Sequence, residues 1–347
     1  MTRWGSGALT PLLHATLLCV SWCHALPGGY WFVGHPSPFF LIGYYGLLSI
    51  SVLGRRLRLT TPRLLICGMA GLMMWVWSAV ALRLLDARWL RVDILDVGHG
   101  DSIVVRTPRG HVLLVDAGSR EAGEYRVVPF LRFAGISTVD ALVLTHTDED
   151  HLGGAIPLLQ AVRVRQLLTN GAPDDTMSAR EVTRLARMQR TKRVVVWKGA
   201  TLASDPTVNI EVLHPPRGLV PGTEPDSNDN SVVLKLTKGA VSVLLCGDIE
   251  EAGLPWLLRE AQALHATILK VPHHGSRLGE VGAQFFKTVK PHMAILSVGR
   301  VHHLPASETM QALANTGAQL YLTRDVGGIH LRTDGQRLEV RTFRRAH

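Results

Sequence analysis

The sequence predicts an α/β fold: a sandwich of two mixed β-sheets with helices outside, preceded by a membrane segment of about three transmembrane helices. Residues 1–90 consist mostly of long apolar runs and contain seven arginines, no lysine and one acidic residue. From about residue 91 onward, short β-branched runs alternate with helical stretches. We therefore expect a membrane segment at 1–90, a folded domain at 91–335 and a basic C-terminal tail at 336–347.

Three apolar runs, 8–26, 39–53 and 64–82, are the candidates for membrane spans. A spanning helix needs about 20 mostly apolar residues, so the run at 64–82 fits best. The first run could instead be a signal peptide, with Arg3 before its apolar part. The arginine-rich loop 54–63 favours the cytoplasmic side, and the third helix would then deliver the domain to the outside. We expect a multi-pass protein of the inner membrane with its domain outside the cytoplasm.

Within the domain, runs of Val, Ile and Leu predict the strands, and "TPRG" and "TKGA" each join two strands into a hairpin. Ser178 and Glu181 have the spacing of a capping box at the start of one helix. The stretch 218–230 is rich in turn-forming residues and predicts an exposed loop. Helices are expected at 149–162, 178–190, 250–264, 279–288 and 307–316.

Residues that can bind metals follow four of the expected strands, and sites in α/β folds are assembled at strand ends. Imidazole suits zinc, manganese or iron, and carboxylates can bridge two ions about 3.5–4 Å apart. A single "GD" or "DAG" is usually an ordinary turn, and "HH" before glycine could be only the start of a loop. Histidines at both ends of one acidic stretch, together with the other three stretches, favour a metal site. The residues are Asp116, then His146, Asp148, Asp150 and His151, then Asp248, then His273 and His274.

The order and spacing of these residues resemble the metallo-β-lactamase superfamily. "HTDEDH" is similar to the H-x-[HD]-x-D-H motif of that superfamily, with Asp148 at the third position. The resemblance implies an αββα sandwich in which Asp116 is a structural aspartate and Asp248 bridges two metal ions. It also implies that His274 completes the ligand set, with His273 as a supporting or substrate-binding residue.

Longer stretches, "LDVGHGDSIVV", "NDNSVVLKL", "LLCGDIE" and "LKVPHHGS", resemble the ComEC family of DNA-internalisation competence proteins over about residues 91–332. In that family a membrane channel domain precedes an extracytoplasmic domain of this type. On this reading the apolar N-terminal part resembles the last helices of the channel domain, and Asp96 and Asp101 are structural residues. Most of the channel domain is missing, so we expect a split or truncated form with a separate channel subunit and DNA-uptake proteins as partners.

The ligand set departs from the superfamily at one place, because "DSNDNS" stands where another histidine usually precedes the bridging aspartate. Asn228, Asp229 or Asn230 could supply an oxygen ligand there, or one metal ion is held weakly. We expect two divalent ions, zinc or manganese. The first would be bound by His146, Asp148 and Asn230, and the second by Asp150, His151 and His274, with Asp248 shared.

Such a centre would hydrolyse a phosphodiester, because bound zinc lowers the pKa of water to about 7 and the ions neutralise charge on phosphate oxygens. We expect Asp150 and Asp248 to be catalytic, and Ser276 and Arg277 to contact a neighbouring phosphate. The expected substrate is single-stranded or duplex DNA, of which the strand not taken up is degraded. Two alternatives are a hydrolase of another phosphodiester and a metal-poor scaffold that guides DNA to the channel.

The formal charge of +9 suits an anionic partner. However, residues after position 90 include 30 basic and 27 acidic residues, which excludes a uniformly basic nucleic-acid surface. Arg180, Arg184 and Arg187 lie at the spacing of one helix face, which could contact phosphates or could simply be a solvated face.

Overall fold

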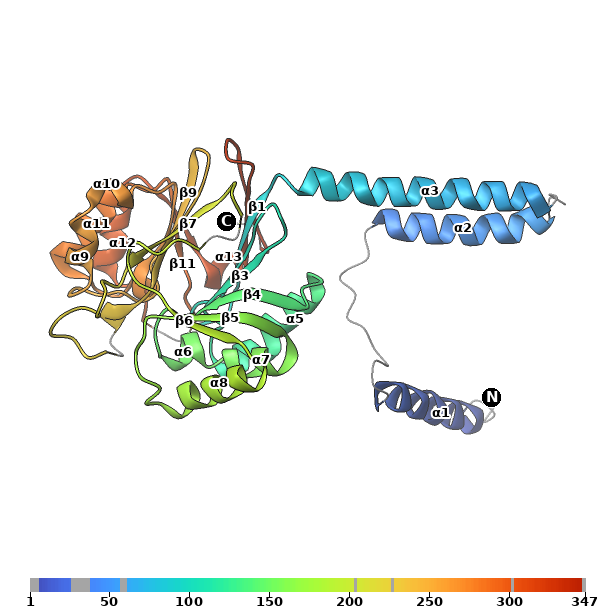
Figure 1. The fold of residues 1–347 in the computed structure, drawn as a ribbon, viewed down its shortest axis with the longest axis horizontal. Helices are drawn as coiled ribbons and strands as arrows, with labels where there is room; N and C mark the ends of the chain where they lie inside the picture. Colours follow the sequence, from blue (N-terminus) through green and yellow to red (C-terminus); the bar gives the residue numbers. More distant parts are fainter. Residues whose placement is uncertain are drawn as a thin grey trace.

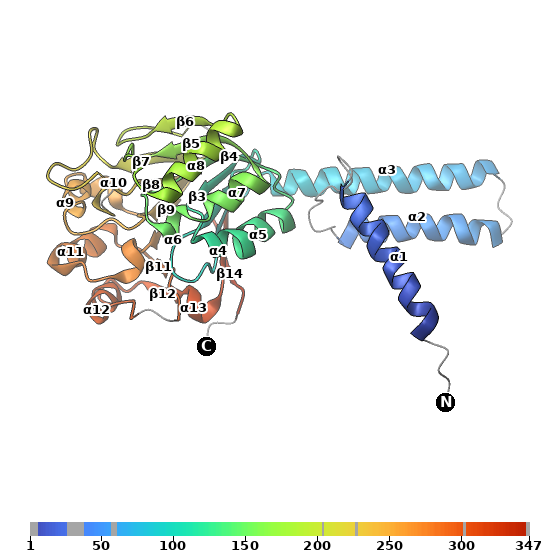
Figure 2. The ribbon, with the colours of Figure 1, turned by 90° about the horizontal axis from the view of Figure 1, so that it is seen from below.

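The domain is a sandwich of two β-sheets with helices on both outer faces (Figure 1 and Figure 2). The computed structural model describes residues 6–25, 38–56, 61–202, 205–225, 228–300 and 303–344. The first sheet has eight strands in the order β14-β13-β1-β2-β3-β4-β5-β6, and the second has six in the order β12-β11-β10-β9-β8-β7. The predicted sandwich of two mixed sheets is confirmed.

In the first sheet, β1, β2 and β3 are antiparallel and β3 to β6 run parallel. The "TPRG" turn joins β2 to β3, as predicted. The strands are β1 (Leu90–Ile94), β2 (Ile103–Arg106), β3 (Val112–Val115), β4 (Thr138–Val143), β5 (Arg163–Thr169), β6 (Lys192–Val195), β13 (Ile329–Thr333) and β14 (Leu338–Thr342).

In the second sheet, β7, β8 and β9 are antiparallel, and β9 to β12 run parallel. The "TKGA" turn joins β8 to β9, again as predicted. The strands are β7 (Asn209–His214), β8 (Val233–Lys238), β9 (Val241–Leu245), β10 (Ile268–Lys270), β11 (Met293–Leu296) and β12 (Gln319–Leu322).

The apolar core has three layers because successive side chains of a strand point to opposite faces of its sheet. On β4, Leu142 packs against the outer helices, whereas Val143 packs between the sheets. On β9, Leu244 packs against the outer helices of the second sheet and Leu245 packs between the sheets. Both sheets are therefore covered on two faces, and polar groups gather where the strands end.

The helices lie on the two outer faces, mostly where the sequence predicts them. On the first face they are α4 (Arg120–Ala122), α5 (Val128–Phe133), α6 (Glu149–Leu152), α7 (Ala155–Ala161) and α8 (Met177–Met188), with the π-helical turn η1 (Gly123–Val127). On the second face they are α9 (Leu254–Leu258), α10 (Ala261–Leu264), α11 (Gly279–Val289) and α12 (Ser307–Ala314). The short elements α13 (Thr323–Val326), η2 (Asn228–Asn230) and η3 (Pro272–Gly275) complete the domain.

Three details of the helices differ from the prediction. The helices between residues 120 and 133 were not predicted, and the one expected at 250–264 consists of α9 and α10. The capping box at Ser178 was wrong, because the hydroxyl of Thr176 accepts the hydrogen bond from the Ala179 amide. Thr176 has the extended backbone typical of an N-cap residue, so α8 begins at the next residue, Met177.

The break between α6 and α7 comes from a close approach of two backbones. A Cβ atom on Gly154 would lie 2.0 Å from the carbonyl oxygen of Ala117, in the turn that follows β3. The Gly154 amide donates to the Gly118 carbonyl at 2.8 Å in the same turn. Only glycine allows this contact, and it holds the end of α6 against the turn that contains Ala117 and Gly118.

The C-terminal tail expected at 336–347 is wrong for residues 338–342, which form β14. This strand pairs antiparallel with β13, and Leu338 and Val340 pack against the core between the sheets. The alternation of apolar side chains in "LEVRT" is enough to add an edge strand. The domain therefore extends beyond 335, and residues 345–347 lie outside the described part of the chain.

Three helices precede the domain: α1 (Ser6–Ala25), α2 (Pro38–Arg56) and α3 (Thr61–Asp86). The helices α2 and α3 lie side by side, with the rings of Phe40 and Trp75 5.2 Å apart, and α3 leads directly into β1 (Figure 1). Within the described ranges, none of the helices combines the length and the apolar character needed to cross a bilayer. The transmembrane spans therefore stay a prediction.

Candidate metal centre

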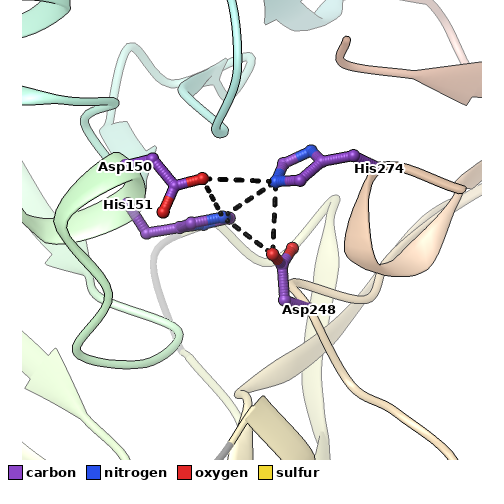
Figure 3. Close-up of side chains that lie close together, drawn as sticks. All are labelled: Asp150, His151, Asp248 and His274. Carbon is purple, nitrogen blue, oxygen red and sulfur yellow. Dashed lines mark hydrogen bonds and ion pairs between the residues drawn. The ribbon is translucent and has the colours of Figure 1, made fainter. Parts of the chain in front are cut away.

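Four side chains converge at the end of the sandwich: Asp150, His151, Asp248 and His274 (Figure 3). Asp150 and His151 stand on α6, which follows β4 of the first sheet. Asp248 follows β9, and His274 lies in η3 after β10, both in the second sheet. Each sheet thus contributes one carboxylate and one imidazole.

The donor atoms of the four residues all lie within 4.8 Å of one another. The Asp248 Oδ2 atom is 3.2 Å from the Nε2 atoms of both His151 and His274, which are 3.3 Å apart. The Asp150 Oδ2 atom is 3.6 Å from His274 Nε2 and 3.8 Å from His151 Nε2. Two imidazole nitrogens and two carboxylate oxygens directed at one point are a suitable ligand set for a divalent transition metal.

Asp116 holds His151 in this orientation. Its Oδ2 atom is 2.8 Å from His151 Nδ1 and accepts a hydrogen bond from the Thr145 hydroxyl at 2.7 Å. Its Oδ1 atom accepts the Thr145 amide at 2.8 Å, so both oxygens are used. A carboxylate behind a ligating histidine fixes the ring and directs its other nitrogen at the metal. Asp116, expected to be structural, therefore contacts His151 from the side opposite the cluster.

The electrostatics of the cluster favour a positive charge between the two carboxylates. Burial opposes charge on each buried group, but Asp248 and Asp150 raise the pKa of His274 to about 9. Despite burial, Asp248 and Asp116 likewise raise the pKa of His151 well above its usual value. Burial would raise the pKa of Asp248, yet the two imidazoles hold it well below its usual range. Protons on the two imidazoles and a metal ion would therefore compete for the same place beside the carboxylates.

His146 and Asp148 lie beside the cluster but form no group of three ligands with it among the described residues. The ring of His146 is 4.2 Å from that of His151, and its Nδ1 atom is 2.9 Å from the Thr145 hydroxyl. Its Nε2 atom is buried, has no hydrogen-bond partner and lies 3.7 Å from Asp148 Oδ2. The Asp148 side chain is 52% exposed, so this pair is the more open part of the centre.

Asn230 does not supply the missing ligand. Its side chain is buried, and its oxygen accepts the Val220 amide at 2.8 Å. Its amide group donates to the Thr223 hydroxyl at 3.1 Å and to the Glu224 carbonyl at 2.9 Å. Both polar atoms of the side chain therefore stabilise the 220–225 loop. Asn230, expected to be a metal ligand, is instead a structural residue.

The residues after β10 line the neighbourhood of the cluster. His273 and His274 both adopt a left-handed backbone, with φ of 43° and 53°, which turns both rings toward the strand ends. His273 Nδ1 pairs with Glu250, and its Nε2 atom is 3.9 Å from Asp248 Oδ2. The hydroxyl of Ser276 is buried without a hydrogen-bond partner, whereas Arg277 is exposed and pairs with Glu308. His273 is therefore adjacent to the cluster, and Arg277 is already engaged by a carboxylate.

The two remaining expected residues have different positions. Asp101, expected to be structural, is buried and forms an ion pair with Lys270 at 2.9 Å. Asp96 lies nearer the surface, with its carboxylate 3.6 Å from the Arg126 guanidinium. Among the described residues, no contact joins Asp96 to the four-residue cluster.

Two site residues were missed in the sequence. The ring of His99 lies 4.3 Å from that of His274, and its Nε2 atom is 3.6 Å from Asp150 Oδ2. "DVGHGD" shows the same signal as the other stretches, a polar group after an apolar strand, and would have identified it. Lys270 could have been found as a charged residue inside an apolar strand, three residues before "HHG".

Two of the arginines on or near α8 pair with acidic side chains, and a third donates to the backbone. Arg184 makes two hydrogen bonds to Glu181, at 2.7 Å each, and Arg180 donates to the backbone of Asp174. Arg193 contacts both oxygens of Asp174 at 3.2 Å. These pairs favour the solvated helix face over a phosphate-binding stripe.

A family model described as "Metallo-beta-lactamase superfamily" matches residues 95–283. The chain belongs to the metallo-β-lactamase superfamily. Its fold and its His/Asp cluster are those of a metal-dependent hydrolase of this superfamily, and the expected αββα sandwich is confirmed.

Within the superfamily, its homologues are competence proteins of the ComEC family, which confirms the resemblance. The chain is 33% identical to ComE operon protein 3 of Bacillus subtilis (strain 168) over 261 residues, 70% of this chain and 33% of that protein. It is 32% identical to Competence protein ComA of Neisseria gonorrhoeae over 209 residues, 60% of this chain and 27% of ComA. It is 27% identical to Recombination protein 2 of Haemophilus influenzae over 281 residues, 79% of this chain and 33% of that protein. The chain thus spans about a third or less of the length of these relatives.

Proposed function

We propose that this protein is a metal-dependent phosphodiesterase that hydrolyses DNA during DNA uptake. The cluster of Asp150, His151, Asp248 and His274 is the observation that carries the proposal, because its potential ligand atoms all lie within 4.8 Å of one another. Homologues named as competence proteins support DNA as the substrate. A fold alone does not define a substrate, so the site and the homologues are needed together.

The four-residue cluster would hold the tighter of two divalent ions, zinc or manganese. His146 and Asp148 would hold a second ion more weakly and share Asp248, whose buried Oδ1 atom has no hydrogen-bond partner. Ions held there lower the pKa of water to near neutral and offset negative charge on a phosphate. The buried Nε2 atom of His146 is a second unused donor that fits this arrangement.

The chain itself contributes orientation and charge to the reaction. Asp116 and Thr145 hold the His151 ring, so the ligand set is formed before substrate arrives. Burial opposes protonation of His273, but Glu250 and Asp248 raise its pKa, which favours a ring that donates a hydrogen bond to a phosphate oxygen. Arg277 would bind a neighbouring phosphate after releasing Glu308, which keeps the guanidinium exposed at the edge of the site.

The proposal includes a location in the inner membrane, with the hydrolase domain outside the cytoplasm and a separate channel subunit as partner. Large apolar side chains are exposed on α1, α2 and α3, including Leu18, Ile42 and Met74, and such surfaces mark contact with a membrane or another protein. The arginines between the second and third apolar runs favour this orientation. Protease added to spheroplasts should digest the domain and spare a cytoplasmic marker, and protection of both would contradict the orientation.

Cleavage of labelled DNA tests the activity. The full chain, purified in detergent and loaded with Mn²⁺ or Zn²⁺, is incubated with single-stranded and duplex DNA. We expect cleavage that a chelator abolishes and that a His151→Ala/Asp248→Asn variant lacks. The matched control is His265→Ala/Asp325→Asn, which changes the same residue types at exposed positions and should cleave normally.

The same assay separates the alternatives. Bound metal without cleavage of either DNA would contradict the nuclease and direct a substrate panel at other phosphodiesters. Absence of bound metal at saturating concentrations would contradict the hydrolase and leave a scaffold that guides DNA.

A further inference from the structure

A buried ion pair lies directly behind the metal centre. Lys270 is 1% exposed, and its ammonium group is 2.9 Å from Asp101 Oδ2. The ammonium also donates to the Val271 carbonyl at 3.0 Å. A lysine this deeply buried is rare without a partner, and the low dielectric makes its charge effective over short distances.

Lys270 supplies the cation of a second acidic cluster. Asp101, Asp116 and His151 form a group whose potential ligand atoms also lie within 4.8 Å of one another. His151 belongs both to this group and to the four-residue cluster. The Lys270 ammonium, 2.9 Å from Asp101, gives this inner group its own cation.

The pair also joins the two halves of the centre. Lys270 ends β10 in the second sheet, four residues before His274. Asp101 belongs to the loop between β1 and β2 of the first sheet, next to Gly100. A Cβ atom on Gly100 would lie 2.0 Å from the carbonyl oxygen of Asp150, so this loop packs tightly behind the first-sheet ligands. The ion pair is thus a polar connection between the backbone that carries Asp150 and the backbone that carries His274.

We propose that Lys270 is a positioning residue for the metal centre: through Asp101 it sets the distance between the ligands of the two sheets. This inference rests on the proposed metal binding. If Lys270 positions the ligands, its replacement weakens metal binding, which is the opposite of the effect expected from its charge alone. Removing a positive charge near a cation site would by itself strengthen metal binding, whereas loss of ligand alignment weakens it.

Metal affinity of Lys270→Met tests the proposal. Mn²⁺ and Zn²⁺ are titrated into the full chain by calorimetry, and circular dichroism measures the folded fraction at each condition. We expect the affinity of the tighter ion to fall about 10- to 100-fold, as it does when other supporting groups of metal ligands are removed. Equal or tighter binding would overturn the proposal.

A second variant keeps the test decisive if Lys270→Met does not fold. Lys270→Met/Asp101→Asn removes both charges, and replacing both members of a buried pair is often neutral for stability. We expect this variant to be more stable than Lys270→Met and still to bind the metal weakly, because the polar connection is gone. Native affinity in the double variant would show that only charge balance matters and would overturn the proposal.

The matched control is Lys238→Met. Lys238 is also buried, at 8% exposure, but it lies at the far end of β8 with its ammonium 3.4 Å from the Thr207 hydroxyl. It should lose stability without losing metal affinity. If the native chain binds no metal, the proposed function fails, whereas equal binding by native and Lys270 variants would refute the role of Lys270 alone.

Discussion

The four-residue cluster and the His146–Asp148 pair contain the same kinds of side chain, yet the structure supports them unequally. In the cluster, His151, Asp248 and His274 are buried, and Asp116 holds His151 from behind. In the pair, Asp148 is half exposed at the start of α6, and its side chain makes no capping hydrogen bond. The type of ligand alone therefore does not give high metal affinity, because burial and supporting hydrogen bonds decide how firmly the ligand atoms are held.

The largest expected effect is that of His151→Ala. This substitution removes the ligand that contacts both Asp248 and Asp116. The affinity of the tighter ion should therefore fall by more than the roughly 100-fold typical of supporting residues. His146→Ala should instead eliminate only the weaker ion. Metal content by mass spectrometry and calorimetric titration measure both, and equal losses in the two variants would remove the distinction between the subsites.

Asp116→Asn should have the next largest effect, a fall of about 10- to 100-fold in the affinity of the tighter ion. An amide keeps one acceptor oxygen, whereas Asp116 accepts or pairs through both oxygens with Thr145 and His151. The His151 ring then loses its orientation. Calorimetric titration measures the change, with Asp140→Asn on the same sheet as control, and native affinity in Asp116→Asn would contradict the supporting role.

The affinity of the cluster should rise with pH by up to about tenfold per unit for each proton released, and should level off above about pH 9. Metal binding requires neutral imidazole, whereas Asp248 and Asp150 raise the pKa of His274 to about 9 despite burial. Calorimetry in buffers of different ionisation enthalpy counts the released protons.

The same shift should affect stability without metal. Because the folded pKa of His274 lies above the unfolded value, its protonation stabilises the metal-free fold fully below about pH 6.5, and this contribution is lost as pH rises to about 9. Thermal unfolding in chelator checks the direction. A metal-free fold that gains stability over this pH range would show that protons do not take the place of the ion.

The smallest expected effect is that of Asp148→Asn. Because Asp148 is half exposed and outside the four-residue cluster, the affinity of the tighter ion should change by less than about threefold. The weaker ion should be lost, which Mn²⁺ counting by electron paramagnetic resonance can show. A large loss of the tighter ion would mean that the two subsites act as one.

Much of the site could be predicted because each metal-capable residue follows an apolar strand. The strands that precede Asp116, Asp248 and His274 are recognisable from their own residues, and strand ends in such a fold lie at one edge. Asn230 could not be predicted, because its amide is equally able to bind a metal or backbone groups. Its orientation was decided by the 220–225 loop, which presents an amide and a carbonyl at hydrogen-bond distance.

The fold shows the same division. Runs of Val, Ile and Leu predict the strands β4 and β9, and the structure has them, each with both faces covered. The strand β14 was missed because a short, basic, C-terminal stretch resembles a solvated tail until β13 is there to pair with it. Helices at 120–133 were missed because their packing against α7 and the first sheet, more than their composition, stabilises them.

Which chemical groups stand at the strand ends follows from local residue patterns, since periodicity and turn residues act over a few positions, and these groups form a hydrolase-type ligand set. Which of those groups meet depends on how the two sheets pack. The tertiary structure brought Asp150, His151, Asp248 and His274 together, turned Asn230 away and placed Lys270 behind the centre, because sheet packing joins residues more than a hundred positions apart.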